Sequence, residues 1–400
     1  MENLLRQGGL GDPTELDFES NGDVDISDFV LLVHGDLLTK ERLDTVRDSR
    51  SLINNTPKNR FQFVVFVLGL FHYKMACVDA LWRTYLQVKE GREDVNSTYQ
   101  HVGILRPRET GLMMTKPGFR QMHNVVHHEL RAVILECWRK ESSRLVSADS
   151  ESASLKAFAE TKPNWELIVK ISEDIVRKYV ATTGGLRQSR AKPESERDQQ
   201  FENQALQNRD YLLYVDLCNA INVGDVGRVE ASFLHWIYVF RATGKHKYAS
   251  QLARYLKNLH EVYPPELSQI VRMNMLCNPT GKPNAFRPVD WLVERNNLYM
   301  KVIYARSGPN RTMDYICQQS PLIEVFRSCH VIHTPPDMTV TIERLREHLQ
   351  STGCCEFQKG RVVEREVMDS IIKGLQTVHA KKPVQPEETH EVEASDLEAH

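Results

Sequence analysis

The amino-acid sequence predicts a mainly α fold, with a small α/β portion near the N-terminus followed by a large helical body. Two continuous apolar runs, residues 29–33 and 61–71, are rich in β-branched and aromatic side chains, as strands covered on both faces are. A segment with helical spacing separates the two runs. Beyond residue 72 strand signals are few, and amphipathic helical patterns follow one another.

The two apolar runs and the helix between them predict a βαβ unit. FVLLV (29–33) is the first strand, LTKERLDTVRDSRSLI (38–53) is the helix and FQFVVFVLGLF (61–71) is the second strand. Elements of these lengths form a right-handed crossover between parallel strands. Either Asp36 or Thr39 is expected to cap the helix, because both side chains can accept hydrogen bonds from its first free amides.

The helical body is predicted from seven amphipathic segments, residues 73–89, 119–143, 165–182, 207–221, 229–243, 246–263 and 265–277. Two polar stretches, 142–158 and 183–200, are expected to be mobile loops. In chain order we expect an extended lead-in (1–28), a small α/β unit (29–90), a helical insertion or body (91–285), C-terminal helices packing back on the α/β unit (286–378) and a disordered acidic tail (379–400).

Composition restricts the class of protein. The 400-residue chain has a net charge of -2, so a nucleic-acid partner would need a local basic surface. No apolar run is long enough to span a membrane, and the N-terminus lacks the pattern of a signal peptide. Eight scattered cysteines without a C-x-x-C pair favour reduced, mostly buried thiols in an intracellular protein, nuclear or cytoplasmic. The absence of a P-loop motif and of a G-x-S-x-G elbow argues against a nucleotide-cradling loop and an α/β hydrolase.

Asp36 and His72 are the first candidate site residues. Sheets of parallel strands bind ligands at the carboxyl ends of the strands, and these residues stand at the ends of the two predicted strands. Asp36 would hold a divalent cation, since hard ions prefer oxygen ligands. His72 would ligate a metal, orient a carboxylate or move a proton. The alternatives are a helix-capping aspartate and a structural histidine.

Residues 278–311 carry the next candidate. NPTGKPNAFRP is a turn-forming lead-in, Asp290 is predicted as the N-cap of the helix after it, and Glu294 lies one turn further on. If folding brings Glu294 against Asp36, the two carboxylates complete an acidic metal site. The alternative is a solvent-facing glutamate paired with a basic neighbour.

The segment MHNVVHHEL places His123 and His127 on one helical face, four residues apart. Two histidines at this spacing can share a zinc ion. The order differs from the H-E-x-x-H motif of metalloproteases, and the sequence suggests no third ligand. The alternative is a half-exposed helix that contains several histidines.

The run FRATGKHKYASQLARYLK (240–257) is basic and contains aromatic residues. Lys245, Lys247 and Arg254 are candidates for phosphate contacts, and Tyr248 is a candidate for stacking on a base. The alternative is the hydrated face of one helix in a bundle.

Four stretches of this sequence resemble a fungal family known only as a domain of unknown function, which has animal relatives and is suspected of transposon origin. They are HGDLLTKERL, RFQFVVFVLGLFHYKMACVDALWR, GRVEASFLHWIYVFRATGKHKYA and NPTGKPNAFRPVDWLVERNNLYMKVIY, in order between about residue 25 and about residue 330.

The arrangement of these blocks is similar to that of RNase H-like transposases, which use three acidic residues and two metal ions to attack a phosphodiester. The resemblance implies a partial RNase H-like βαβ unit, in which Asp36 is the second acidic ligand, Glu294 is the third and His72 lies at the edge of the site. The chain before Phe29 is short and shows no strand hairpin to carry the first ligand.

We therefore expect a transposon-derived, nucleic-acid-associated domain, with DNA as the partner and with two-metal phosphoryl transfer lost or incomplete. If activity survives, the cofactor would be Mg²⁺ or Mn²⁺. The competing hypothesis is a non-enzymatic helical protein-interaction module.

Overall fold

The structure is a computed structural model and describes residues 9–11, 18, 22–25, 29–51, 60–146, 155–295 and 337–379. Most of these residues are helical, so the prediction of a mainly α protein is confirmed. Two compact units are distinguished, one of residues 1–73, 221–226 and 250–297 and one of residues 74–220, 227–249 and 298–400. The five-segment organisation expected from the sequence stays a prediction. None of the described helices is long and apolar enough to cross a membrane.

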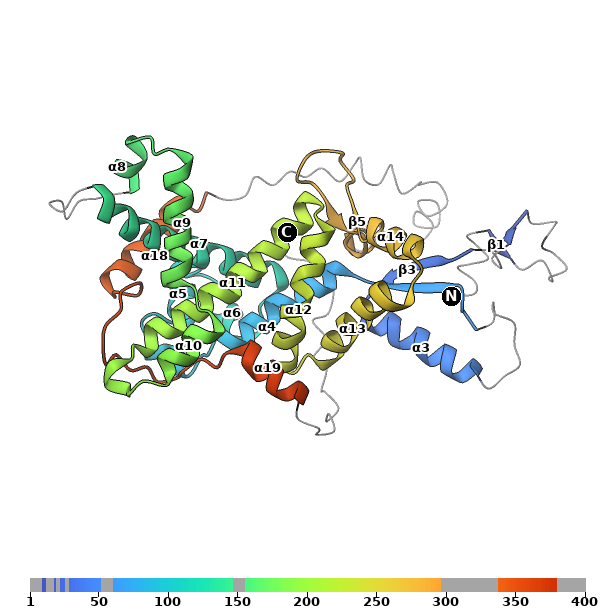
Figure 1. Ribbon diagram of the computed structural model, residues 1–400, viewed down its shortest axis with the longest axis horizontal. Helices are drawn as coiled ribbons and strands as arrows, with labels where there is room; N and C mark the ends of the chain where they lie inside the picture. The colour runs from blue at the N-terminus through green and yellow to red at the C-terminus, as the bar shows by residue number, and fades with distance from the viewer. Residues whose placement is uncertain are drawn as a thin grey trace, which may run out of the picture. The chain divides into compact units, whose positions relative to one another are not determined.

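The first unit contains the βαβ arrangement. Strands β3 (Leu31–Gly35) and β4 (Val64–Leu68) pair in parallel, with Leu31 opposite Val64 and Gly35 opposite Leu68 (Figure 1). Helix α3 (Leu37–Ser51) lies between them in the sequence. Both predicted strands are therefore present, the first two residues later than expected and the second shortened at both ends.

The core of this βαβ arrangement forms where α3 meets the strands. Leu43 of α3 packs with Phe61 and Val64, and all three side chains are buried. Val33 of β3 extends the same cluster. The guanidinium of Arg47 donates a hydrogen bond of 2.7 Å from Nη2 to the carbonyl oxygen of Phe61, which fixes α3 against the start of β4.

The first unit also contains two further strand pairs and several helical segments. β1 (Leu10–Gly11) is parallel to β2 (Val24–Asp25), and β5 (Leu276–Cys277) is antiparallel to β6 (Arg287–Pro288). The helical segments are the π-helix η3 (Asn258–Val262), α14 (Pro265–Met273) and residues 289–295. Each sheet in the described part of the chain has two strands, and a wider RNase H-like sheet stays a prediction.

The second unit is helical. Its elements are η1 (Glu90–Arg92), α5 (Thr98–Leu105), α6 (Thr110–Thr115), α7 (Phe119–Val146), α8 (Leu155–Glu160), α9 (Trp165–Tyr179), α10 (Thr183–Arg190), η2 (Glu194–Glu196), α18 (Thr339–Ser351) and α19 (Ser370–His379). Four helices have residues in both units: α4 (Leu70–Tyr85), α11 (Gln199–Val223), α12 (Val226–Ala242) and α13 (His246–Lys257). All seven helical segments expected from the sequence are present.

Helix α10 corrects one expectation, because residues 183–200 were expected to form a loop. The hydroxyl of Thr182 accepts a hydrogen bond of 3.1 Å from the amide of Gly185 and so caps the helix. Leu186 is buried and anchors the helix on its apolar side. The cap and the packing of the buried leucine stabilise a short helix in this polar stretch, because tertiary packing supplies most of the stability of short helices.

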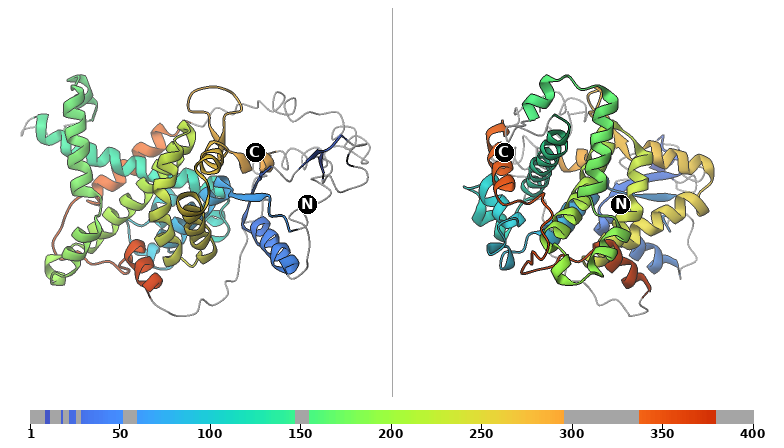
Figure 2. Two further views of the ribbon diagram at one scale, coloured as in Figure 1. Left: turned by 45° about the vertical axis from the view of Figure 1, so that its right-hand side comes forward. Right: turned by 60° about the vertical axis from the view of Figure 1, so that its left-hand side comes forward.

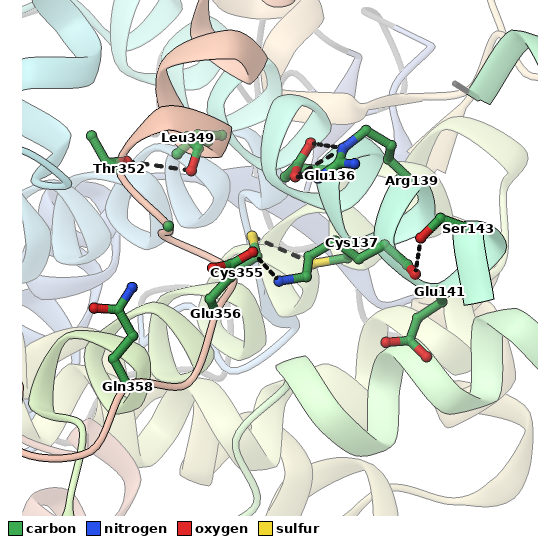
Figure 3. A network of polar contacts seen from close by, with 12 residues as sticks. Glu136, Cys137, Arg139, Glu141, Ser143, Leu349, Thr352, Cys355, Glu356 and Gln358 are labelled. Carbon is green, nitrogen blue, oxygen red and sulfur yellow. Dashed lines mark hydrogen bonds and ion pairs between the residues drawn. The ribbon is translucent and has the colours of Figure 1, made fainter. Parts of the chain in front are cut away.

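Helix α7 contacts α5, α8, α9 and α18, and Figures 1 and 2 show α18 alongside it. Polar contacts also hold the residues after α18 against α7 (Figure 3). The thiol of Cys137 donates to the sulfur of Cys355 at 3.8 Å, and Lys140 Nζ donates to Glu356 Oε1 at 2.8 Å. The six described cysteines are free, and all are buried except the half-buried Cys277, as the sequence predicted for thiols of this kind.

Candidate functional site

Asp36 stands between β3 and α3 in the first unit. Its Oδ1 accepts a hydrogen bond of 2.7 Å from the amide of Thr39, so Asp36, and not Thr39, caps α3. This cap is the structural role that the sequence left open as an alternative. It uses one of the two carboxylate oxygens.

His72 lies in the first turn of α4, and its predicted place at the end of a strand is wrong. β4 ends at Leu68, because the carboxylate of Asp290 starts a helix two residues later. Both oxygens of Asp290 lie 3.0 Å from the amide nitrogen of Phe71, and Oδ2 lies 3.1 Å from that of His72. The predicted role of Asp290 as the cap of its own helix is therefore also wrong: it caps α4, 219 positions away in the sequence.

The close approach of Asp290 to the end of β4 requires a glycine at position 69. The amide of Gly69 donates to the carbonyl oxygen of Gly35 at 2.9 Å. A β-carbon on Gly69 would overlap with the Asp290 carboxylate and lie 2.9 Å from the same Gly35 oxygen. The glycine thus lets the strand end, the helix start and the carboxylate meet at one point.

The imidazole of His72 lies between two carboxylates. Its Nδ1 donates to Asp290 Oδ2 at 2.9 Å, and its Nε2 lies 3.7 Å from Glu294 Oε1. Burial lowers the pKa of His72, but the hydrogen bond that the ring donates to Asp290 and the charges of Asp290, Glu294 and Asp36 outweigh burial and raise the pKa overall. The structure therefore brings Glu294 to His72 and leaves Asp36 close enough for its charge to act on the ring.

This arrangement resembles the way proteins prepare a histidine to ligate a metal. A ligating histidine usually donates its second ring N–H to a carboxylate, which fixes the tautomer and the ring orientation. Here Asp290 would be that carboxylate, and Nε2 would be the ligand atom beside Glu294. Two ligand atoms bonded to one cation at about 2.1 Å lie roughly 3.0–3.4 Å apart. The 3.7 Å between Nε2 and Oε1 would need only a small side-chain movement.

The four residues of the predicted nucleic-acid surface are divided between the two units. Lys245 Nζ forms an ion pair of 2.6 Å with an aspartate of α4, Lys247 is exposed, and the ring of Tyr248 packs on a phenylalanine of α12. Arg254, in the first unit, pairs with an aspartate of α3 at 3.2 Å. The two pairs neutralise part of the charge that phosphate binding would use.

The predicted histidine pair lies in the second unit. His123 and His127 face the buried Cys218 of α11, and one possible ligand atom from each of the three lies within 4.8 Å of the others. Burial, and then neighbouring cationic and histidine side chains, lower the pKa of His123 to about 2 and that of His127 to about 4. Both rings are therefore neutral near pH 7.

Sequence reasoning missed the roles of Asp290 and Cys218. Asp290 looks like an ordinary cap of its own helix, and a partner 219 positions away leaves no local signal. Cys218 sits in an apolar helical pattern in which a small buried residue is expected. One available signal was Gly69, because an isolated glycine inside an apolar strand pattern such as residues 61–71 often marks a bend or a close backbone approach.

The comparisons with known proteins give no activity to carry over. No curated protein and no solved structure matches the chain. The model of a family described as "Family of unknown function (DUF6589)" matches residues 1–331. By this match over most of its length, the chain belongs to the family of unknown function DUF6589.

Proposed function

We propose that the chain is a transposase-like, nucleic-acid-associated domain in which Asp36, His72 and Glu294 bind one divalent cation, and in which two-metal phosphoryl transfer is incomplete. The observation that supports the proposal is the ring of His72, whose Nδ1 is held by Asp290 while its Nε2 approaches Glu294. The pairing of one histidine with carboxylates favours Mn²⁺ over Mg²⁺, because imidazole is a softer ligand than oxygen.

The number of free ligand atoms favours one cation over two. Both oxygens of Asp290 already accept hydrogen bonds from α4, and one oxygen of Asp36 accepts the amide of Thr39. The second Asp36 oxygen, the Glu294 carboxylate and Nε2 of His72 are left for a metal. Two ions about 3.5–4 Å apart need a carboxylate that bridges them as well as further ligands for each ion.

A non-enzymatic interaction module is the second candidate function. The hydrogen bonds that Asp290 accepts from the amides of Phe71 and His72 and from the ring of His72 are sufficient to explain His72 as part of a structural cap. In this case the four blocks of sequence that carry the family resemblance serve only as core, and the cluster binds no metal.

Titration calorimetry with Mn²⁺ on the full chain separates the two candidates. Under the proposal, one Mn²⁺ binds per chain, and Asp36→Asn and Glu294→Gln each weaken its affinity at least about tenfold, since each removes a ligand. Glu266→Gln, which changes an exposed carboxylate of α14 in the same unit, is the matched control and leaves affinity unchanged. Absence of binding, or equal binding by all variants, supports the interaction module.

A salt titration tests the nucleic-acid partner. Binding to a DNA duplex should weaken steeply as salt rises, because phosphate contacts release counterions. Lys247→Ala should reduce the slope of log affinity against log salt by about one, whereas Lys170→Ala, at an exposed position on α9, should not change it. A flat response to salt, or no binding, rejects DNA as the partner.

A further inference from the structure

A second cluster of potential metal ligands lies in the helical second unit. It joins two helices that are distant in the sequence: His123 and His127 come from α7, and Cys218 comes from α11. One ligand atom from each residue lies within 4.8 Å of the other two. Among the described residues, this is the one group of three histidine, cysteine or acidic side chains gathered so closely.

The two histidines present their rings to the same point. They are four residues apart on α7, so they share a face of the helix, and their ring centroids lie 4.3 Å apart. Nε2 of His127 is buried and has no hydrogen-bond partner within the described part of the chain. An unpaired ring nitrogen inside a protein costs free energy, and a bound metal would remove that cost.

Tyr214 orients the other two members of the cluster. Its hydroxyl oxygen lies 2.8 Å from Nδ1 of His123 and also contacts the thiol of Cys218. If Nδ1–H donates to this hydroxyl, Nε2 of His123 keeps its lone pair for a ligand. Tyr214 is fully buried in α11, so the hydroxyl can hold the imidazole and the sulfur in fixed orientations.

We propose that His123, His127 and Cys218 form a binding site for a zinc ion. Two neutral imidazoles and a thiolate are ligands that Zn²⁺ prefers, and three protein ligands leave a fourth tetrahedral position for water. In a tetrahedral site with Zn–N of about 2.0–2.1 Å and Zn–S of about 2.3 Å, neighbouring ligand atoms lie roughly 3.3–3.6 Å apart. Separations of up to 4.8 Å would therefore have to shorten by about 1.2–1.5 Å at most, which side-chain rotation can supply. On binding, the thiol proton of Cys218 is released to the buffer and the sulfur bonds to zinc.

The ammonium group of Lys74 opposes cation binding. Its charge acts on both histidines and on Cys218, and its Nζ lies 5.4 Å from the centroid of the Phe119 ring. The negative charge of the thiolate offsets part of this repulsion. Lys74→Met should consequently tighten zinc binding, whereas it would have no such effect if the cluster were only packed core.

Titration with Co²⁺ tests the site, because cobalt substitutes for zinc and its bond to a thiolate gives a charge-transfer absorption in the near ultraviolet. The full chain, kept reduced by a reagent that is not itself a thiol, should bind one Co²⁺ and show this absorption. One equivalent of Zn²⁺ should displace the cobalt and abolish the absorption. Tyr214→Phe should weaken affinity about 10–100-fold, as expected for the loss of a residue that orients ligands. Cys218→Ser should remove the absorption, and His127→Gln should weaken binding more than Tyr214→Phe does.

Two control variants make the result specific. His235→Ala changes an exposed histidine of α12, and Cys277→Ser changes a half-buried thiol elsewhere in the chain, so neither should alter the absorption or the affinity. Circular dichroism shows which variants fold. If Cys218→Ser does not fold, the result for His127→Gln decides whether the cluster binds metal. The proposal is overturned if Co²⁺ binds without a sulfur charge-transfer band, or if His127→Gln binds it as the wild type does.

Discussion

The substitution Asp290→Asn tests how the first unit joins its distant segments. The Asp290 carboxylate is 4% exposed, caps the first turn of α4 through the amides of Phe71 and His72, and accepts a hydrogen bond from the imidazole of His72. Loss of charge at a helix N-terminus costs about 1–2 kcal/mol, and loss of a hydrogen bond to a charged group costs about 1.5–3 kcal/mol. Together the change should destabilise the start of α4 by roughly 3–5 kcal/mol. The corresponding change Asp36→Asn should cost under about 0.5 kcal/mol, because asparagine caps α3 nearly as well as aspartate does.

Hydrogen exchange followed by mass spectrometry measures this local effect, since a chain with two compact units need not unfold in a single step. At about 1.36 kcal/mol for each factor of ten, amides in the first turn of α4 should exchange roughly two to four orders of magnitude faster in Asp290→Asn. Asp36→Asn should leave those amides nearly unchanged. If exchange in Asp290→Asn differs from the wild type by less than about threefold, the capping role assigned to Asp290 is incorrect.

Two further predictions concern the second unit. Burial raises the pKa of Asp369, but the hydrogen bonds and charge of Arg209 outweigh burial and lower the pKa overall. The stability that this pair contributes is therefore fully present above the unfolded pKa of 3.8 and is lost as the pH falls through the lower folded pKa. Asp369→Asn should therefore cost the urea-unfolding transition of the second unit about 2–4 kcal/mol near pH 7 and progressively less below about pH 4. A cost that does not depend on pH would contradict the pairing. A β-carbon on Gly374 would lie 2.7 Å from the Cα of Tyr238. Gly374→Ala should therefore destabilise the packing of α19 by about 1–3 kcal/mol, although alanine has the better helix propensity. If limited proteolysis cleaves α19 of the variant at the wild-type rate, the contact is absent.

The βαβ arrangement could be predicted from the sequence because its signals are local. The apolar runs at 29–33 and 61–71 predict strands, and the helix between them has its own period and its own cap at Asp36. The expectation that both strands are covered on both faces is wrong for the first run, because Phe29 and Val30 are exposed and β3 is only half-buried. The exact ends could not be predicted. Residues 70 and 71 continue the apolar run, and the distant carboxylate of Asp290 caps the helix that they begin, so they do not extend the strand.

The same reason limits what the sequence says about sites. The proximity of Glu294 and His72 depends on a fold that joins residues more than 200 positions apart, and so does the cap that Asp290 gives to α4. The spacing of His123 and His127 is visible on a single helix, whereas the sulfur that completes the cluster lies on another helix. Local patterns therefore identify pairs, and the tertiary packing decides which third residue joins them.

The most direct test of the proposed cation site is an anomalous difference map from a crystal of the full chain soaked in Mn²⁺. A single strong peak is expected in the first unit, bonded at about 2.0–2.3 Å to Nε2 of His72 and to carboxylate oxygens of Glu294 and Asp36. Absence of a peak at these residues, with His72 still held by Asp290 alone, would contradict the account and leave the cluster as a structural cap.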